Sequence, residues 1–121
     1  IRYAREGHPV APVIAMYLER GLTNYERHQK TTPFDFTNAR KTWFANGRAP
    51  KAGEMFRNPD LANTLERIAQ NGRDEFYAGE TARIMVDYLQ RQGSAFTLAD
   101  FAAHRSEWVD VSCVEYRRGY E

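Results

Sequence analysis

Residues 58–72 read NPDLANTLERIAQNG, and this stretch decides the class of the fold. Asn58 is a favoured helix N-cap, Pro59 suits the first helical position, and Asp60 lies at the positive end of the helix dipole. The apolar residues that follow repeat at helical spacing: Leu61, Leu65, Ile68 and Ala69. Gly72 after Asn71 is a stop signal. The pattern therefore predicts a capped amphipathic helix over residues 59–71.

Helix start and stop signals also occur downstream. Residues 80–92 predict a second helix, and Gly93 stops it. Its buried face is expected to hold Ala82, Met85, Val86 and Leu89. Residues 97–100 read TLAD, which resembles a capping box with Asp in place of Glu. This box predicts a short helix that runs to about His104.

Upstream, proline and glycine divide the chain into further helices. Residues 1–6 read as the end of a helix that Gly7 stops, and residues 8–11 must be extended because residues before proline avoid the helical region. A helix is predicted to begin at Pro12 and to end by residues 31–33. Its apolar face would hold Val13, Met16 and Tyr17. A shorter helix is predicted from Thr37, with a turn at residues 46–47.

Strand signals are confined to the last residues of the chain. Residues 108–114 read WVDVSCV, and their β-branched content predicts a strand. Residues 116–120 read YRRGY, which predicts a turn into a second strand. The expected fold class is therefore mainly α, with one or two short β-strands near the C-terminus. The aromatic residues expected to anchor the packing are Tyr3, Tyr17, Trp43, Phe44, Phe76, Tyr88, Phe101 and Trp108.

Composition sets the outer bounds. The 121 residues leave room for one domain, with 42% hydrophobic and 27% charged residues. A net charge of +1 argues against a general nucleic-acid surface, and no apolar run is long enough to span a membrane. The chain has no initiator Met, and both ends interrupt predicted elements. We therefore expect residues 1–121 to be a single fragment that is truncated at both ends.

The histidines and the cysteine favour structural roles. His8, His28 and His104 are far apart and lack the i, i+4 spacing of a helical metal pair. Cys113 is the sole cysteine, so the chain can form no internal disulfide. It lies in the predicted strand with no His nearby, which favours a buried, inert thiol. No metal site and no cofactor-binding residue is predicted.

Three acids and one basic stretch are candidates for chemistry. Asp74, Glu75 and Glu80 could act as an acid–base set only in a cleft that raises their pKa values. Arg73 and Arg83 are close in the sequence, which favours solvated ion pairs instead. The basic stretch 48–51 lies between Gly47 and Gly53, but its spacing matches no phosphate-binding loop.

The pair Thr31-Thr32 raises one further possibility. A threonine can be a nucleophile when it is N-terminal, because its own α-amine serves as the base. Thr32, however, precedes Pro33, and no β-rich segment follows to hold an oxyanion site. A linker that ends a helix is the favoured interpretation. The residues alone therefore predict no catalytic group in this chain.

Five segments, in order, resemble one enzyme family. Residues 1–10 (IRYAREGHPV) resemble its pattern A-x-E-G-F-P-V, and residues 53–62 (GEMFRNPDLA) resemble G-E-x-x-x-x-P-D-L-A. Residues 65–79 (LERIAQNGRDEFYAG) are similar to L-x-x-I-A-x-x-G-x-x-x-F-Y-x-G. Residues 96–104 (FTLADFAAH) and 116–120 (YRRGY) resemble T-x-x-D-L-A-x-Y and Y-R-G-Y more loosely. The ordered set resembles the C-terminal part of the large subunit of γ-glutamyltranspeptidases.

This resemblance implies a parent precursor of the N-terminal-nucleophile hydrolase class, with an αββα sandwich, that cleaves itself into two subunits. The new N-terminal Thr of the small subunit would attack γ-glutamyl amides of the glutathione type. The resemblance implies no cofactor, and the family's nucleophile would lie outside residues 1–121. The partners would be the remainder of the large subunit, the small subunit and a γ-glutamyl substrate. A periplasmic or extracellular parent is also implied.

Two alternatives stay open at this point. The parent could deacylate other amides, as the related cephalosporin acylases do. The chain could instead be a helical binding or interaction module that stands alone. These alternatives predict different sequence beyond residue 121, because only the enzyme requires a downstream Thr followed by a β-rich, glycine-containing segment.

Overall fold

The computed structural model describes residues 1–32 and 35–114. Helices dominate this part of the chain, so the mainly helical class is confirmed. The longest helices are α2 (Pro12–His28), α4 (Pro59–Asn71) and α6 (Glu80–Arg91). The shorter ones are α1 (Arg2–Glu6), α3 (Thr37–Trp43), α5 (Arg73–Tyr77), α7 (Leu98–Ala103) and a 3-10 turn, η1 (Ala45–Gly47).

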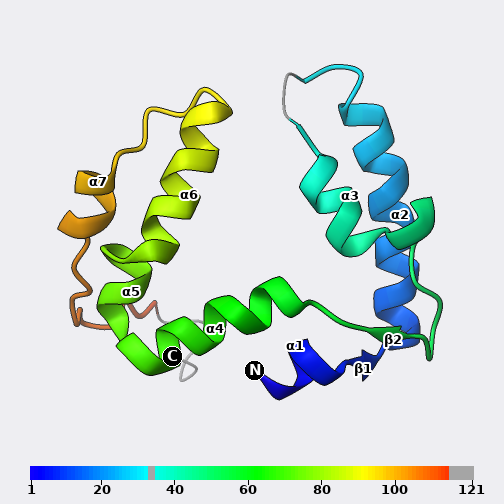
Figure 1. The fold of residues 1–121 in the computed structure, drawn as a ribbon, viewed down its shortest axis with the longest axis horizontal. Coiled ribbons are helices and arrows are strands. Elements are labelled where there is room, and N and C mark those ends of the chain that lie inside the picture. Colours follow the sequence, from blue (N-terminus) through cyan, green and yellow to red (C-terminus); the bar gives the residue numbers. More distant parts are fainter. Residues whose placement is uncertain (33–34, 115–121) are drawn as a thin grey trace.

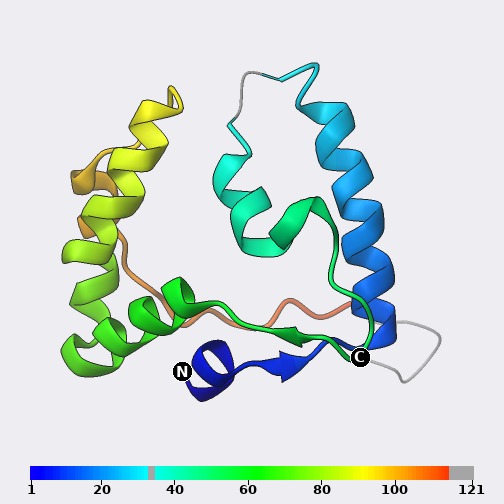
Figure 2. The same ribbon diagram turned by 45° about the vertical axis from the view of Figure 1, so that its right-hand side comes forward.

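The helices form a horseshoe (Figure 1). Its base holds α1 and α4 together with two short strands, β1 (His8–Pro9) and β2 (Met55–Phe56). One side, called the first lobe, holds α2, α3 and η1. The other side, called the second lobe, holds α5, α6 and α7. Figure 2 shows the two lobes still on opposite sides of the base after the turn.

The base is held by contacts between residues about fifty positions apart. β1 and β2 pair antiparallel, with His8 opposite Phe56 and Pro9 opposite Met55. The backbone N–H of Asn58 donates to the carbonyl of Ala4 at 2.9 Å, so the pairing continues into α1. Arg57 Nε donates to the carbonyl of Glu6 at 2.9 Å. These bonds fix α1 against the start of α4.

Each lobe has a small core of its own. In the first lobe, the ring of Tyr25 meets Phe36 at 5.0 Å and Phe44 at 5.7 Å, both edge-on, and Phe44 is 3% exposed. In the second lobe, Ala82 and Val86 of α6 are buried, and Ala62 of α4 is buried in the base.

The predicted helix boundaries are largely confirmed, because local capping sets them. Asn58 Oδ1 accepts from the backbone N–H of Leu61 at 3.0 Å. Thr97 and Asp100 form the reciprocal capping box that opens α7. Gly72 has φ +70° and ends α4, as its stop signal predicted. The short helix α5 was not predicted.

The strand prediction was wrong in its position. Residues 108–114 form neither helix nor strand, and the two strands of the described chain lie at residues 8–9 and 55–56. A strand needs a partner backbone, and residues 108–114 meet none here. The second predicted strand, at residues 116–120, lies outside the described residues.

Several apolar side chains expected in the core are instead exposed. Of the eight aromatic anchors, Phe44 is buried and Phe76, Tyr88 and Phe101 are half-buried. Trp43 is exposed but stacks on Phe56, with centroids 5.0 Å apart. The remaining three are exposed: Tyr3, Tyr17 and Trp108. The apolar face predicted on α2 is also exposed.

Among the described residues, no helix is long and apolar enough to cross a bilayer.

Candidate functional site

The histidines pack against aromatic rings or lie in solvent. His8 meets Phe56 edge-on at 5.9 Å, and His104 stacks on Tyr77 at 4.8 Å. His28 is exposed at the last turn of α2. Within residues 1–32 and 35–114, no three His, Cys, Asp or Glu side chains converge on a possible metal position. His8 and His104 thus pack on aromatic rings, and His28 lies at the surface.

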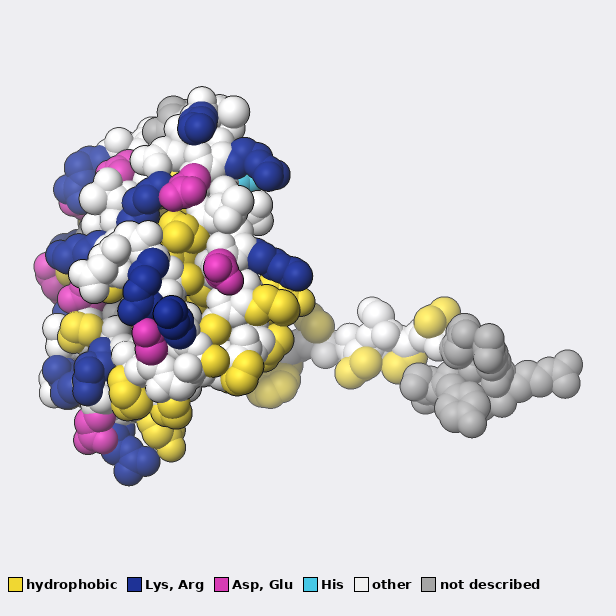
Figure 3. Space-filling model, turned by 90° about the vertical axis from the view of Figure 1, so that its right-hand side faces the viewer, with side chains coloured by type: hydrophobic (Ala, Val, Ile, Leu, Met, Phe, Trp, Pro, Cys, Tyr) yellow, Lys and Arg dark blue, Asp and Glu magenta, His cyan; other side chains and the backbone are white. Residues whose placement is uncertain are grey.

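Cys113 corrects one prediction. Its thiol is exposed, whereas the sequence favoured a buried one. The thiol is exposed because residues 108–114 form no strand and pack against nothing described. Figure 3 shows this segment as a narrow projection from the body.

The three candidate acids differ in how far they are buried. Asp74 pairs with Arg73 at 3.2 Å and Glu80 pairs with Arg83 at 3.4 Å, all with exposed side chains, as predicted. Glu75 differs, because it is 9% exposed and pairs with Arg67 of α4. The prediction of a solvated ion pair was therefore wrong for Glu75.

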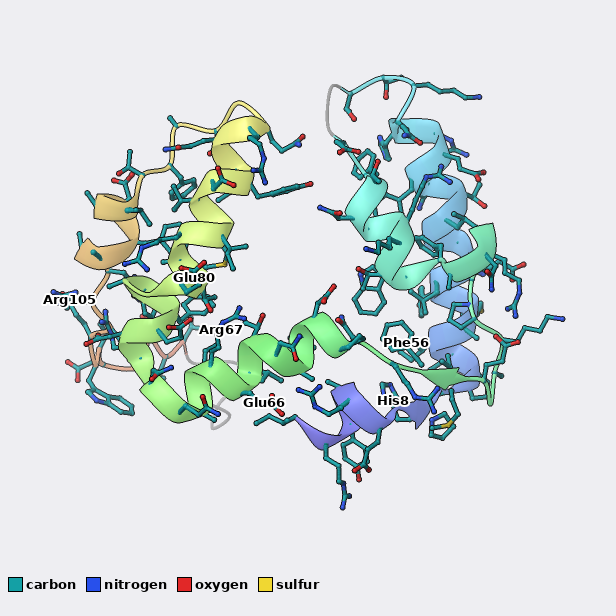
Figure 4. All side chains as sticks on the ribbon, viewed as in Figure 1. His8, Phe56, Glu66, Arg67, Glu80 and Arg105 are labelled. Carbon is teal, nitrogen blue, oxygen red and sulfur yellow. The ribbon has the colours of Figure 1, made fainter. Side chains whose placement is uncertain are left out.

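Glu75 is the centre of the one buried polar cluster seen in the described residues. Its Oε1 accepts from the backbone N–H of Thr81 at 3.0 Å and from the Thr81 hydroxyl at 2.9 Å. Arg67 Nε lies 3.3 Å from the same oxygen. Because Thr81 is in the first turn of α6, this carboxylate lies at the positive end of the helix. Figure 4 shows Arg67 and Glu80 at this junction of helices.

These contacts keep the Glu75 carboxylate ionised. The hydrogen bond from the Thr81 side chain is the main cause that lowers the pKa of Glu75, and the Arg67 charge adds to it. A general acid at neutral pH needs the opposite, a raised pKa. The cluster therefore acts as a fixed acceptor that joins α4, α5 and α6.

Gly79 is a necessary part of this cluster. A Cβ at this position would lie 2.5 Å from Glu75 Oε2 and 2.7 Å from the Cα of Glu75. The missing side chain lets the chain turn closely over Glu75 before α6 begins. The spacing Glu75-x-x-x-Gly79-x-Thr81 is the signal that could have revealed the cluster in the sequence.

The side chains and backbone of the basic stretch 48–51 bind Glu54 of the same loop. Arg48 binds Glu54 through both terminal nitrogens at 2.9 and 3.0 Å, and the backbone N–H of Lys51 donates to Glu54 at 2.9 Å. The hydrogen bond from Arg48 is the main cause that lowers the pKa of Glu54. The loop amides are therefore partly engaged by a carboxylate of the chain, which agrees with the absence of a phosphate-loop motif.

Thr31 and Thr32 end the helix, as predicted. Both hydroxyls donate to the carbonyl of His28 at 3.1 Å, and the backbone N–H groups of the same two residues donate to that carbonyl at 2.9 Å. Among the described residues, no hydrogen bond joins either hydroxyl to a His or carboxylate side chain.

A pocket of about 620 Å³ lies between the tips of the two lobes. Phe36, Ala39 and Leu89 give it apolar walls. Two hydrogen bonds span it, since the Tyr88 hydroxyl donates to the Asp35 carbonyl at 3.2 Å and the Asp35 N–H donates to Gln92 at 3.1 Å. The Asp35 carboxylate accepts from the N–H of Thr37, and its pKa is lowered by hydrogen bonds from that residue. The pocket therefore offers packing surface rather than an acid–base pair.

Comparison with known proteins gives a consistent assignment. The family model described as gamma-glutamyltranspeptidase matches residues 1–121. A glutathione hydrolase-like proenzyme of Bacillus subtilis is 36% identical over 118 residues, which are 98% of this chain and 21% of that protein. The chain spans about a fifth or less of the length of the first relatives that it matches.

Solved structures agree with that assignment. A cephalosporin acylase from Bacillus halodurans superposes with a TM-score of 0.82 at 35% identity, over 96% of this chain and 21% of that one. The γ-glutamyltranspeptidase of Helicobacter pylori also gives a TM-score of 0.82, at 23% identity, over 98% of this chain and 32% of that one. The second likeness concerns the fold alone.

Proposed function

Because this chain belongs to the γ-glutamyltranspeptidase family, we propose that residues 1–121 are a helical, non-catalytic segment of the large subunit of a longer enzyme. That enzyme transfers or hydrolyses γ-glutamyl groups of glutathione-type substrates. The family match along the whole chain is the observation that carries the proposal. The share of the relatives that the chain spans, about a fifth, supports a longer parent.

The nucleophile of this enzyme is an N-terminal Thr outside residues 1–121. Such a residue carries both its hydroxyl and the amine that acts as base, so the large subunit needs no acid–base pair. The engagement of the Thr31 and Thr32 hydroxyls at the end of α2 supports this placement. The name proenzyme, given to the Bacillus subtilis relative, supports a precursor that is cut.

The non-catalytic role rests on the state of the carboxylates. Glu75, Glu54 and Asp35 all have lowered pKa values caused by hydrogen bonds from the chain itself. Carboxylates held in this way are ionised at neutral pH and already have donors. They support a scaffold that packs beside a catalytic centre formed elsewhere.

The test is expression of the full-length protein. Gel electrophoresis and mass spectrometry should find two chains, the smaller of which begins with Thr. Replacing that Thr by Ala should leave one uncut, inactive chain. A full-length protein that stays intact yet hydrolyses γ-glutamyl anilides would overturn the proposed mechanism.

The chain of residues 1–121 provides the complementary test. Purified alone, it should not hydrolyse γ-glutamyl anilides. Turnover that a substitution within residues 1–121 abolishes would show that the active site had been misassigned. A full-length protein that is neither cut nor active would favour the binding module.

A second candidate is an amide acylase with a different acyl group. The likeness to the cephalosporin acylase, at 35% identity and a TM-score of 0.82, favours it specifically. Both candidates share the N-terminal Thr and differ in substrate. Parallel assays of the full-length enzyme on γ-glutamyl anilides and on an acylated cephalosporin would separate them through the ratio of kcat/KM values.

A further inference from the structure

A cavity of about 300 Å³ lies where the end of α3 meets β2. Its lining comes from the last turn of α3, from η1, from the loop that follows η1, and from β2 with Arg57 after it. Figure 4 shows Phe56, on β2, at the boundary between the base and the first lobe. The volume is at the lower limit of the usual range for ligand pockets, so the cavity suits a ligand with a single ring.

One wall of the cavity is a flat aromatic surface. The rings of Trp43 and Phe56 both line it and are nearly parallel, at 7°, with centroids 5.0 Å apart. Trp43 is nevertheless 40% exposed, so part of the indole stays open beside the stack. Phe56 belongs to a paired strand, which fixes the orientation of the indole. An aromatic face held in this way binds planar rings by offset stacking.

The lining also has more positive charge than the chain itself neutralises. It includes Lys41, Arg48 and Arg57, with Glu54 as its one acid. Glu54 pairs with both terminal nitrogens of Arg48, so these two charges cancel. Arg57 donates from Nε to the carbonyl of Glu6. Within residues 1–32 and 35–114, no side-chain hydrogen bond or ion pair engages Lys41 or the terminal nitrogens of Arg57. Two cations are therefore available to an anion from outside.

We propose that this cavity binds a small aromatic carboxylate, whose ring stacks on Trp43 and whose carboxylate pairs with Lys41 and Arg57. A carboxylate fits the two terminal nitrogens of a guanidinium and forms two parallel hydrogen bonds with them. The ring is needed as well, because an exposed ion pair alone contributes little. The site is formed wholly by residues 41–57 and does not depend on the proposed function.

The backbone of the loop favours a carboxylate over a phosphate group. Loops that bind phosphate present several unpaired backbone N–H groups to it. Here the N–H of Lys51 donates to the Glu54 side chain at 2.9 Å, and the N–H of Glu54 donates to the carbonyl of Lys51 at 3.1 Å. The N–H of Gly53 donates to the carbonyl of Val10 at 2.8 Å. Side chains must therefore hold the anion, and the planar fork of Arg57 matches a planar carboxylate.

The experiment measures the binding of benzoate to the full-length protein by saturation-transfer NMR at increasing ligand concentration. Benzamide has the same ring without the charge, and cyclohexanecarboxylate has the charge without the aromatic ring. Benzoate should bind at least about threefold more tightly than either, because stacking and the ion pair both contribute. Its Kd should also rise with salt, which screens exposed charges. No binding of benzoate, or binding equal to that of benzamide or cyclohexanecarboxylate, would overturn the proposal.

Two matched pairs of variants locate the site. Lys41→Gln removes a charge from the lining, whereas Lys51→Gln removes the same charge from outside it. Trp43→Leu removes the stacking surface, and Trp108→Leu is its control because Trp108 is 104% exposed. Lys41→Gln and Trp43→Leu should each raise the Kd for benzoate about threefold or more, and the two controls should leave it unchanged. Equal effects within each pair would place benzoate elsewhere and overturn the assignment.

Lys41→Gln keeps the test decisive if Trp43→Leu disturbs the fold. Lys41 is exposed, so its replacement should leave the Tm unchanged. The binding measurements require no enzymatic activity. A full-length protein that binds benzoate in this way and lacks γ-glutamyl activity would retain the site and refute the function. An active, processed enzyme that binds no benzoate would refute the site alone.

Discussion

Gly79 gives the sharpest prediction, because one added methyl group there meets a backbone. The Cβ of Gly79→Ala would lie 2.5 Å from Glu75 Oε2, 2.7 Å from its Cα and 2.8 Å from its carbonyl oxygen. Two of these three atoms belong to the backbone of α5, so a rotamer change of Glu75 cannot relieve the overlap. Relief requires α5 and the start of α6 to separate, which lengthens the hydrogen bonds between Glu75 and Thr81.

The expected loss is roughly 2–3 kcal/mol in the free energy of unfolding, the upper part of the range for overpacked sites. Gly21→Ala is the matched control, because the same methyl group is added inside α2, where Phe44 Cζ is the nearest atom, 4.0 Å away. There the change should stabilise the chain by about 0.5–1 kcal/mol, as alanine does within a helix. The free energy of unfolding should therefore be lower than that of the wild type for Gly79→Ala and higher for Gly21→Ala.

Urea unfolding followed by circular dichroism at 222 nm measures both variants. With a slope of about 1–3 kcal/mol per molar urea, the midpoints of the two variants should differ by about 1 M or more. Thermal unfolding should give the same order. A Gly79→Ala midpoint at or above that of the wild type would refute the reasoning, because the overlap with Glu75 would then not destabilise the fold.

Three further predictions concern charge, capping and the lobe tips. The folded-state pKa of Glu75 is lowered, so the ionised carboxylate stabilises the fold above an unfolded pKa of about 4.3, and this stabilisation is lost as pH falls through the folded pKa. The difference in unfolding free energy between the wild type and Glu75→Gln should therefore shrink below about pH 4. A difference that stays constant with pH would contradict this. Asn58→Ala should lower the unfolding free energy by about 1 kcal/mol, whereas Asn24→Ala, within α2, should not. Tyr88→Phe should cost at most about 1 kcal/mol yet speed amide exchange at Asp35, and unchanged exchange would refute the bridge between the lobes.

Local signals explain why the helices could be predicted. Asn58, Gly72 and the box formed by Thr97 and Asp100 act on backbone groups within a few residues, so the sequence contains both partners of each interaction. The positions of these helix ends were accordingly predicted within one or two residues. The apolar face of α6 was also predicted, because the helical spacing of Ala82 and Val86 puts them on one side of the helix, where both are buried.

The spacing of Glu75, Gly79 and Thr81 is local, but the third partner of the buried cluster is not. Arg67 contacts Glu75 from another helix. Sequence spacing therefore could not show which arginine pairs with Glu75. The strand prediction failed for a related reason. Residues 108–114 have the composition of a strand, but a strand exists only where a partner backbone is present. Exposed aromatic residues such as Tyr17 likewise could not be told from packed ones by residue type.

The pairing of β1 with β2 also sets an order of events during folding. It joins His8 to Phe56 and so encloses both α2 and α3 in a long loop. Closing a loop of this length carries an entropy cost of roughly 3 kcal/mol, before any contact within it is counted. The contacts among α4, α5 and α6 span far fewer residues and face a smaller cost. We therefore expect the second lobe to form first and to offer α4 as the template on which the two distant strands meet.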